Sequence, residues 1–500
     1  MKIKLLFSAV MLSFFFLVLC PFSIRAGVEV PLCNAGTLGL SGYLKNETYI
    51  RAWHGPDDIM SSRNVFNLDL DVSFSSIPIL RRCFIQLRPF YDTVFDWENK
   101  GTGGGSSKLR RHFQDNFGKA DDWDPLLREC WVDLSFGKLD ARLGRQLVSW
   151  GKSDGVWMLD LINPFNWRNG CVFEEEDTKI PLWMVNLNYQ VKPMHTLQFL
   201  FIPRYVPAHN PFNGHDWAAN VTRWVDDFYT WFDDCFQDEG WGRFLVDTRE
   251  PATTFSNSEF GVKWSGMGKG ITYTLNYFYT WSDYLTDYPN TGDWHTAYGV
   301  KRRADRLSIF GGSADYCWDN FLGLKQMVTR GEFAYFKNAV WYDYDFYPKE
   351  KDYIGVLLGF DKYYFVDYWF SFQAQATYIP HADHWRSAYY DLGSGYKGNP
   401  RFPSPDVFNG YGTGMRDSLE TNFTLYLMKD YLPGDILHTE WFLLYDDDGA
   451  FWFRPKVKYD VTNQFHVTVG ANLFWGNEDD PFVGESRNND NLFVEFKWDF

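Results

Sequence analysis

Charged side chains that could line a water-filled passage recur on one face of several segments whose polarity alternates. Arg82 and Arg88 share one face of an early segment, and Arg142 shares a face with Gln146. A late segment carries a row of three cations, Arg454, Lys456 and Lys458. The acids that could oppose these cations are Glu332, Asp367, Glu420, Glu440 and Glu495. Opposed rows would set a transverse field across a lumen and bias which solutes pass, whereas charges that pair with one another would brace the wall. The residues alone leave both interpretations open.

Signatures of catalysis, phosphate binding and metal binding do not emerge from the sequence. Residues 151–155 read GKSDG and have the spacing of G-x-S-x-G, but they lie in an expected loop and not in the strand-to-helix turn that presents a nucleophile. Residues 101–107 read GTGGGSS and lack the Gly-Lys-Ser/Thr of a phosphate loop. The aspartates of residues 204–254 do not have the spacing of an EF-hand, and His438 on the face of Glu440 is typical of a wall rather than a catalyst. We expect no enzyme, no cofactor and no metal site. A lipid hydrolase with a Ser/His pair at a membrane rim is the enzymatic alternative.

The composition excludes several classes of protein. The chain has 500 residues, a formal net charge of −16 and a mean hydropathy of −0.35, and aromatic residues make up 20% of it. A helical membrane bundle needs about 20 apolar residues for each span, and only the N-terminus holds a long apolar run. The acidic balance argues against a nucleic-acid partner. A hydrophobic content of 45% excludes a disordered chain.

Residues 1–26 have the layout of a signal peptide. Lys2 and Lys4 precede an apolar run from Leu5 to Leu19, and a cleavage site follows at Ala26. Cys20 is not expected to carry a lipid anchor, because the preceding Leu19 is not small. We therefore expect an exported protein whose mature chain is residues 27–500.

Six cysteines remain after cleavage, with irregular spacing. An exported protein could pair some of them, and Cys171 and Cys235, both in expected loops, are the best candidates. The alternative is that the thiols stay free and pack like small apolar side chains. The spacing alone does not fix the pairing.

The rest of the chain reads as short amphipathic strands. In residues 491–500, Leu492, Val494, Phe496 and Trp498 alternate with polar side chains, and the segment ends at Phe500. A terminal aromatic of this kind resembles the assembly signal of outer-membrane barrels. Eighteen such segments lie near 36–54, 63–77, 80–94, 126–136, 139–149, 180–190, 194–203, 255–265, 270–283, 303–318, 322–337, 352–361, 364–379, 416–429, 434–446, 450–460, 463–475 and 490–500.

The connections between these segments alternate between short and long, apart from a short turn at 447–449. Short turns on one side and long loops on the other are typical of a bacterial outer-membrane barrel. We predict an all-β fold, a transmembrane antiparallel β-barrel of about 18 strands (16–18) with short periplasmic turns and long extracellular loops. The many aromatic side chains would then form belts at the membrane interfaces.

Residues 126–168 carry a pattern that closely resembles the bacterial family called "domain of unknown function 1302". The matching residues are Arg128, Glu129, Asp133, Gly144, Arg145, Gln146, Trp150, Gly151, Asp154, Gly155, Asp160, Asn163 and Pro164, followed by Glu175, Asp177, Ile180, Pro181, Ile202, Pro203, Tyr205 and Pro207. The resemblance implies an outer-membrane barrel of Gram-negative bacteria. Family members often occur beside a periplasmic companion family and inner-membrane exporters of the resistance-nodulation type. That setting implies traffic of apolar or amphipathic compounds.

The segment 150–180 is too rich in tryptophan to project freely into water, since it carries Trp150, Trp157 and Trp167. We predict that it folds into the lumen and narrows it. Arg145 would tie this loop to the wall through Asp154 or Asp160. We expect these three residues to brace the loop, and direct contact with a solute is the alternative.

The functional expectation is an outer-membrane channel that passes small or amphipathic solutes. The alternative is a non-conducting barrel, plugged by residues 95–125 and 150–180, that binds partners or lipid. Expected partners are outer-membrane lipid and lipopolysaccharide, the barrel assembly machinery acting through Phe500, and the periplasmic and exporter proteins that the resemblance implies. The substrate, the oligomeric state and the exact strand number do not follow from the sequence.

Overall fold

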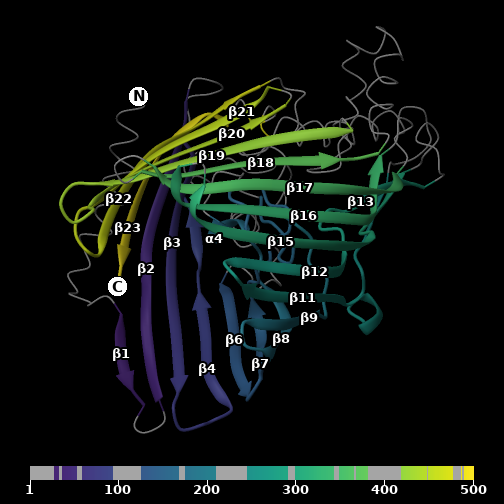
Figure 1. Ribbon diagram of the computed structural model, residues 1–500, viewed down its shortest axis with the longest axis horizontal. Helices are drawn as coiled ribbons and strands as arrows, with labels where there is room; N and C mark the ends of the chain where they lie inside the picture. Colours follow the sequence, from purple (N-terminus) through teal and green to yellow (C-terminus); the bar gives the residue numbers. More distant parts are fainter. Residues whose placement is uncertain are drawn as a thin grey trace.

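The computed structural model is a closed barrel of antiparallel strands (Figure 1). It describes residues 27–32, 36–52, 59–93, 126–167, 175–209, 245–290, 299–321, 323–342, 348–364, 368–380, 418–447, 449–476, 483, 486 and 489–500. The predicted signal peptide, the segment 95–125, Asp367, Cys171 and Cys235 lie outside these residues.

Eighteen strands form the wall, and each overlaps one of the predicted segments. They are β2 (Gly36–Arg51), β3 (Ile59–Phe74), β4 (Leu80–Leu87), β6 (Leu127–Phe136), β7 (Leu139–Gln146), β8 (Leu182–Lys192), β9 (His195–Ile202), β11 (Glu259–Gly268), β12 (Ile271–Trp281), β15 (Arg306–Phe321), β16 (Leu324–Tyr342), β17 (Pro348–Tyr364), β18 (Tyr368–Tyr378), β19 (Leu419–Tyr431), β20 (Leu437–Asp446), β21 (Phe451–Asp460), β22 (Phe465–Trp475) and β23 (Asn491–Asp499). The last strand closes the ring against the first, in a register that runs from Tyr43 opposite Asp499 to Arg51 opposite Asn491.

Short hairpin turns join the strands at one end of the barrel, as predicted. In the turn from β11 to β12, Lys269 and Gly270 both have positive φ, at 53° and 80°. Two such residues form the tight turn whose twist matches that of paired strands. The expected connection 338–351 was too long, because β16 continues to Tyr342 and β17 begins at Pro348, with a register shift between Phe336 and Ala339. Val340, Trp341 and Tyr342 are strand formers, which explains the extension.

Several short strands accompany the eighteen strands of the wall, and all but β5 lie outside the predicted strand segments. β10 (Leu245–Arg249), β13 (Thr286–Pro289) and β14 (Gly299–Arg303) form a separate three-stranded sheet between the ends of barrel strands. Apart from Arg303, the first residue of a predicted strand, these residues were expected to be loop. β1 (Val28–Pro31) pairs with β2. β5 (Phe90–Asp92), which falls within the predicted segment 80–94, pairs with β3. Because each of these strands has at most five residues, none shows a clear alternation in the sequence.

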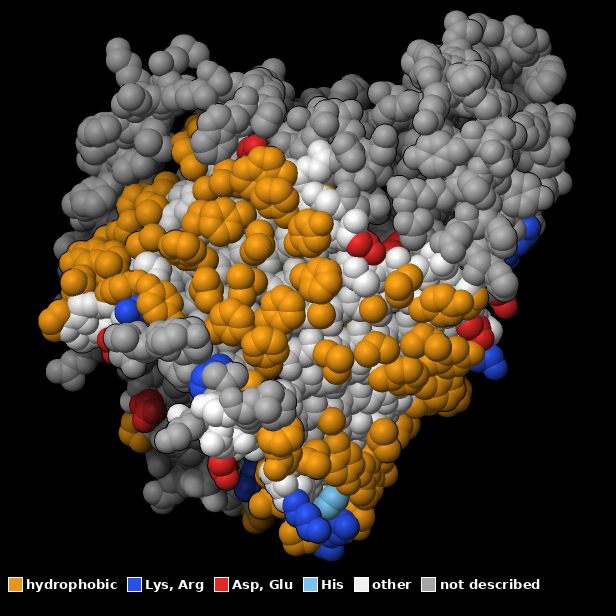
Figure 2. All heavy atoms as spheres, turned by 45° about the horizontal axis from the view of Figure 1, so that its top comes forward, with side chains coloured by type: hydrophobic (Ala, Val, Ile, Leu, Met, Phe, Trp, Pro, Cys, Tyr) orange, Lys and Arg blue, Asp and Glu red, His pale blue; other side chains and the backbone are white. Residues whose placement is uncertain are grey.

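The outer face of the wall is apolar, and the inner face is polar along much of each strand. Leu275, Leu358 and Trp441 are more than half exposed, whereas Ser371 and Gln373 are buried. Figure 2 shows hydrophobic side chains spread over the strands of one outer face. The alternation of apolar-out and polar-in is what a lipid-facing barrel requires. Within the described part of the chain, no helical segment is long and apolar enough to cross a membrane.

Three cysteines fall in described strands, and all are free thiols: Cys83, Cys130 and Cys317. For these three, the interpretation as unpaired side chains is confirmed.

Candidate functional site

The connection from β7 to β8 leaves the wall after Gln146 and folds into the lumen. We call its described residues, 147–167 and 175–181, the lumenal loop. The backbone N–H of Lys152 donates to Glu332 on β16. The backbone N–H of Asp154 donates to Gln373 Oε1 on β18 at 2.9 Å. Thr424 Oγ1 on β19 donates to the carbonyl of Asp154 at 3.2 Å. The loop therefore folds into the lumen, as the sequence predicted, and it reaches strands far around the wall from its origin.

Ion pairs hold the tip of the loop against this part of the wall. Asp154 pairs with Arg330 on β16 at 3.0 Å, and Arg330 also pairs with Asp361 on β17. Lys152 pairs with Asp315 on β15. Gln373 Nε2 donates to Asp154 Oδ2 at 3.0 Å. Each charged group of the loop tip thus contacts an opposite charge or an amide. These contacts offset the free-energy cost of desolvating the charge.

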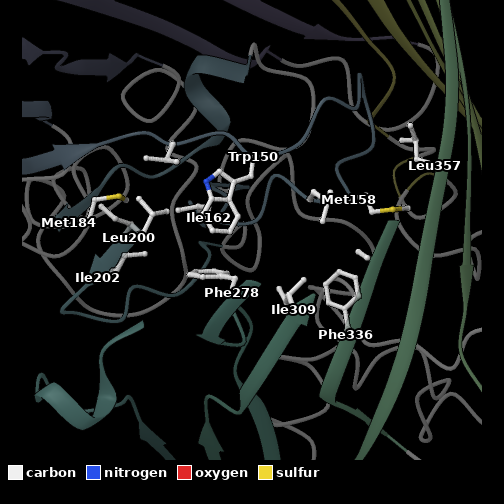
Figure 3. Close-up of a cluster of buried hydrophobic side chains, with 14 residues drawn as sticks. Trp150, Met158, Ile162, Met184, Leu200, Ile202, Phe278, Ile309, Phe336 and Leu357 are labelled. Carbon is white, nitrogen blue, oxygen red and sulfur yellow. The ribbon is translucent and has the colours of Figure 1, made fainter. Parts of the chain in front are cut away.

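An apolar cluster holds the middle of the loop (Figure 3). Trp150, Met158, Leu159 and Ile162 pack against inward side chains of the wall: Met184, Leu200, Ile202, Phe278, Ile309, Ala334, Phe336 and Leu357. These side chains come from strands β8, β9, β12, β15, β16 and β17. Burial of this apolar surface accounts for the inward fold of a tryptophan-rich loop.

Glycines in the strands leave room for the loop side chains. A Cβ on Gly261 of β11 would lie 2.7 Å from Cη2 of Trp150, and one on Gly355 of β17 would lie 3.0 Å from Cε of Met158. A Cβ on Gly311 of β15 would overlap the side chain of Leu159. Glycine inside a strand often marks a close approach of this kind. The wall is therefore shaped for this loop.

Trp150 combines apolar packing with polar contacts. Its Nε1 donates to Gln198 Oε1 on β9 at 2.9 Å, and its ring meets that of Phe278 edge-on at 6.0 Å. Lys263 Nζ on β11 lies 5.6 Å from the ring centroid. The indole is thus fixed in orientation, with a cation on one side.

Asn163 joins the two ends of the loop. Its Oδ1 accepts from the N–H of Val148 at 2.7 Å, and its Nδ2 donates to the carbonyl of Ile180 at 2.9 Å. The side chain is fully buried. It therefore bonds to backbone groups at both the start and the end of the loop.

The acids of the loop find different partners from the one expected. The sequence suggested Arg145 as the partner of Asp154 or Asp160. In the structure Asp154 pairs with Arg330, and Asp160 pairs with Lys179 within the loop. Arg145 Nε donates to the carbonyl of Arg128 at 2.9 Å. The two acids brace the loop through cations that the sequence analysis did not single out.

The far end of the loop carries α4 (Glu175–Thr178), which reaches a basic cluster on the wall. Asp177 lies 2.7 Å from Arg63 on β3, 2.9 Å from Arg88, and 3.4 Å from Lys45 on β2. Burial alone would raise the pKa of Asp177, but the charges of Arg63, Arg88, Lys45 and Arg128 hold this pKa well below its usual range. We call Asp177 with Lys45, Arg63 and Arg88 the loop anchor.

The structure places the remaining predicted lumenal charges mostly in pairs between neighbouring strands. Arg82 pairs with Asp71 at 2.6 Å, Arg142 with Asp133 at 2.7 Å, Lys456 with Glu440 at 2.8 Å, Lys458 with Asp460 at 3.1 Å, and Glu495 with Lys45 at 3.9 Å. Arg454 is buried, with its guanidinium 5.6 Å from the ring of Phe493. Glu420 stands opposite Thr377 on β18. Arg88 is part of the loop anchor, and Glu495 lies beside it through Lys45.

A chain of alternating acids and imidazoles lines the wall near the short turns. His438 lies 2.6 Å from Asp430 and 3.0 Å from Asp460. His466 lies 2.5 Å from Asp460 and 3.0 Å from Asp499. Each imidazole therefore bridges two carboxylates from different strands. His438 is part of the wall, as the sequence suggested.

Sequence reasoning missed Lys45, Glu47, Arg63 and Arg330 as site residues. Asp177 was part of the family pattern but was not singled out. Glu47 pairs with Arg63 at 2.5 Å and with Lys45 at 3.3 Å, so it completes the cluster around Asp177. Lys45 and Glu47 share a face of β2, and Arg63 lies opposite Glu47 in register. Their alternation was a usable signal, but their pairing with a loop far along the chain was not.

A family model described as "Protein of unknown function (DUF1302)" matches residues 55–500. Among solved structures, OccK3 (OpdO) of Pseudomonas aeruginosa is 11% identical, with a TM-score of 0.47 over 93% of this chain and 95% of that one. OccAB2 of Acinetobacter baumannii is 9% identical, with a TM-score of 0.48 over 93% and 98%. No curated protein matches the chain.

Proposed function

Because the chain belongs to the family described as "Protein of unknown function (DUF1302)", whose description assigns no activity, we propose from its own barrel that it is an outer-membrane channel. It passes small or amphipathic solutes through a lumen that the lumenal loop narrows. The observation that carries this proposal is the loop itself. It extends from β7 to β19 inside a wall of eighteen strands, a size that leaves an aqueous channel in known barrels.

The lining of the narrowed lumen supports the proposal that the solutes are amphipathic. The loop places apolar and charged side chains in the lumen: the Trp157 ring is only half-buried, and the Asp154 carboxylate, which pairs with Arg330, is 36% exposed. A solute with an apolar body and a polar group can contact both kinds of surface. The proposal includes no catalytic step.

The location and the partners form part of the same proposal. The apolar outer face suits the outer membrane of a Gram-negative cell, with phospholipid and lipopolysaccharide as its neighbours. The barrel assembly machinery would recognise Phe500. A periplasmic protein and an inner-membrane exporter would supply or receive the solute.

The test is single-channel recording from the refolded mature protein in planar bilayers. We expect steady current steps, and larger steps from a variant in which residues 152–160 are replaced by a short Gly/Ser linker. Wild-type protein and variant must both show the gel mobility shift on heating that marks a folded barrel. Equal steps from the two proteins would contradict a constriction by the loop.

The second candidate is a non-conducting barrel whose surface loops bind partners. It is favoured by the number of polar and ionic contacts that pin the loop at both ends, from Arg330 to the loop anchor. Correctly folded protein that stays silent in bilayers, with and without the loop replacement, would select this candidate.

A further inference from the structure

Three exposed lysines lie on neighbouring turns at the short-turn end of the barrel. Lys138 is in the turn from β6 to β7, Lys192 ends β8, and Lys269 is in the turn from β11 to β12. The N–H of Gln190 donates to the carbonyl of Lys138 at 2.8 Å, and the N–H of Met267 donates to the carbonyl of Met194 at 3.0 Å. These two bonds join the three turns in a row along the rim. We call Lys138, Lys192 and Lys269 the turn lysines.

The turns themselves hold no acid that would neutralise these cations. Residues 136–138, 191–195 and 267–271 contain the three lysines and neither Asp nor Glu. Among the residues that the structure describes, none of the turn lysines has an acidic partner. Asp140, the next acid along the chain, shares the inward face of β7 with Arg142. In a chain with a net charge of −16, this stretch of the rim is locally basic.

Exposed apolar side chains accompany the turn lysines on the same turns. More than a third of the side-chain surface is exposed in each of Phe136, Val191, Met194, Met267 and Ile271. Figure 2 shows basic side chains and a histidine at the lower tip of the molecule, among hydrophobic side chains. A lysine can lay its stem along apolar surface and keep its ammonium at the polar boundary. Such a surface suits the boundary between a membrane and water.

Amphipathic rings mark the same level on the outer face of the wall. The ring of His195 lies 5.6 Å from that of Trp264 and 6.3 Å from that of Tyr273. A Cβ on Gly266 would lie 2.6 Å from Tyr273 Oη and 2.8 Å from His195 Nδ1, so this glycine lets both side chains lie close against the strand. Leu197, the next outward residue after His195, is exposed. Aromatic rings with a polar atom are typical of the head-group level of a membrane.

We propose that the turn lysines bind the phosphate of an anionic phospholipid, of the phosphatidylglycerol class, in the leaflet that faces the periplasm. Lys192 and Lys269, on the two turns beside His195 and Tyr273, contact the phosphate. The acyl chains lie on the exposed apolar side chains below. These side chains continue into the lipid-facing wall, which favours a lipid over an acidic protein as the partner. The inference rests on the proposed outer-membrane location and names a ligand of the outer wall, not a solute of the lumen.

Native mass spectrometry of the folded mature protein in detergent measures lipid binding without conduction. The probes are phosphatidylglycerol and phosphatidylethanolamine with the same acyl chains, so that only the head groups differ. We expect the wild type to bind phosphatidylglycerol more tightly. The double variant Lys192→Gln/Lys269→Gln should weaken this binding about 25-fold, because each lysine near an anionic lipid surface contributes about fivefold, or about 1 kcal/mol. Phosphatidylethanolamine should be affected far less. Lys192→Arg/Lys269→Arg keeps the charge and should retain the affinity.

The double variant Lys301→Gln/Lys337→Gln is the matched control, since it removes the same charge from exposed residues at the opposite end of the barrel. It should bind phosphatidylglycerol as the wild type does. Equal binding by the wild type and Lys192→Gln/Lys269→Gln would overturn the proposal. A wild type without preference for phosphatidylglycerol would also overturn it and leave the turn lysines to an acidic protein. Displacement of the lipid by glycerol phosphate would assign the site to free phosphate instead. A barrel that is silent in bilayers but binds the lipid through these lysines would refute the channel alone.

Discussion

Asp177 on α4 and Arg63 on β3 lie 2.7 Å apart, in the interior of the barrel. Both side chains are largely buried, at 9% and 5% exposure. Arg88 engages the other oxygen of the same carboxylate at 2.9 Å. A carboxylate held by cations on both oxygens fixes its segment in place, and here the segment is the far end of the lumenal loop. Removal of one member of a buried pair leaves the other charge uncompensated, and this lowers the free energy of unfolding.

Asp177→Asn should therefore release the end of the loop. We expect the free energy of unfolding to fall by about 3 kcal/mol, since the loss of one partner from a buried ion pair costs about 3–5 kcal/mol. Guanidinium unfolding followed by circular dichroism measures this loss. Asp247→Asn is the control, because Asp247 pairs with Arg249 on an exposed surface, where a pair contributes about 1 kcal/mol or less. Equal losses in the two variants would show that Asp177 does not anchor the loop.

The pKa of Asp177 also predicts how the anchor responds to acid. Because this pKa is lowered in the folded protein, its stabilisation is complete above the ordinary pKa of an aspartate and is lost only as the pH falls through the lowered value. The anchor should therefore hold at neutral pH and through mildly acidic pH, and release only in strong acid. Protease cleavage of the loop, measured from pH 7 downward on folded barrel, checks this. Asp177→Asn should be cleaved equally at all pH values where the protease is active and the barrel stays folded.

The barrel was predictable from the sequence because its signal is local. Alternation over about ten residues, as in 491–500, identifies a strand without any knowledge of its neighbours. The extent of β16 was harder to predict, because the bulge between Phe336 and Ala339 interrupts the alternation.

The lumenal loop was predictable as a feature, but its contacts were not. Three tryptophans showed that residues 150–180 need an apolar environment. The partners of Asp154 and Asp177 are Arg330 and Arg63, which become neighbours only when the sheet closes. Arg145 looked like the natural partner because it is near in sequence, and proximity along the chain is a poor guide inside a barrel.

Gly261 should be required to leave space for the indole of Trp150. A Cβ at this position meets the rigid indole at 2.7 Å, so Gly261→Ala must displace the ring or the strand, at a cost of about 1–3 kcal/mol. We expect lower stability and altered near-ultraviolet circular dichroism from the moved tryptophan. Gly268→Ala, on the same strand, is the control, since no atom lies within 4 Å of its Cβ. A Gly261→Ala protein as stable as Gly268→Ala would mean that the indole is not tightly held.

Phe500 should matter for closure of the wall as well as for recognition during assembly. Its N–H donates to the carbonyl of Gly42 at 2.9 Å, the N–H of Gly42 donates back at 2.8 Å, and its ring stacks on Phe66 at 6.1 Å. These contacts join the end of the chain to β2 and β3. Phe500→Ala keeps the backbone bonds but removes the ring, at a cost of about 2 kcal/mol for lost apolar and aromatic contact.

Refolding of Phe500→Ala into detergent separates these two roles of the residue. We expect the variant to fold in vitro with reduced stability. Its yield in cell membranes should fall by more than this loss of stability explains. Phe465→Ala is the control, because Phe465 also stacks an outward aromatic ring, on Phe496 at 6.4 Å, but does not end the chain. If both variants reach the membrane in equal amounts, Phe500 contributes only packing, and the assembly signal must lie elsewhere in β23.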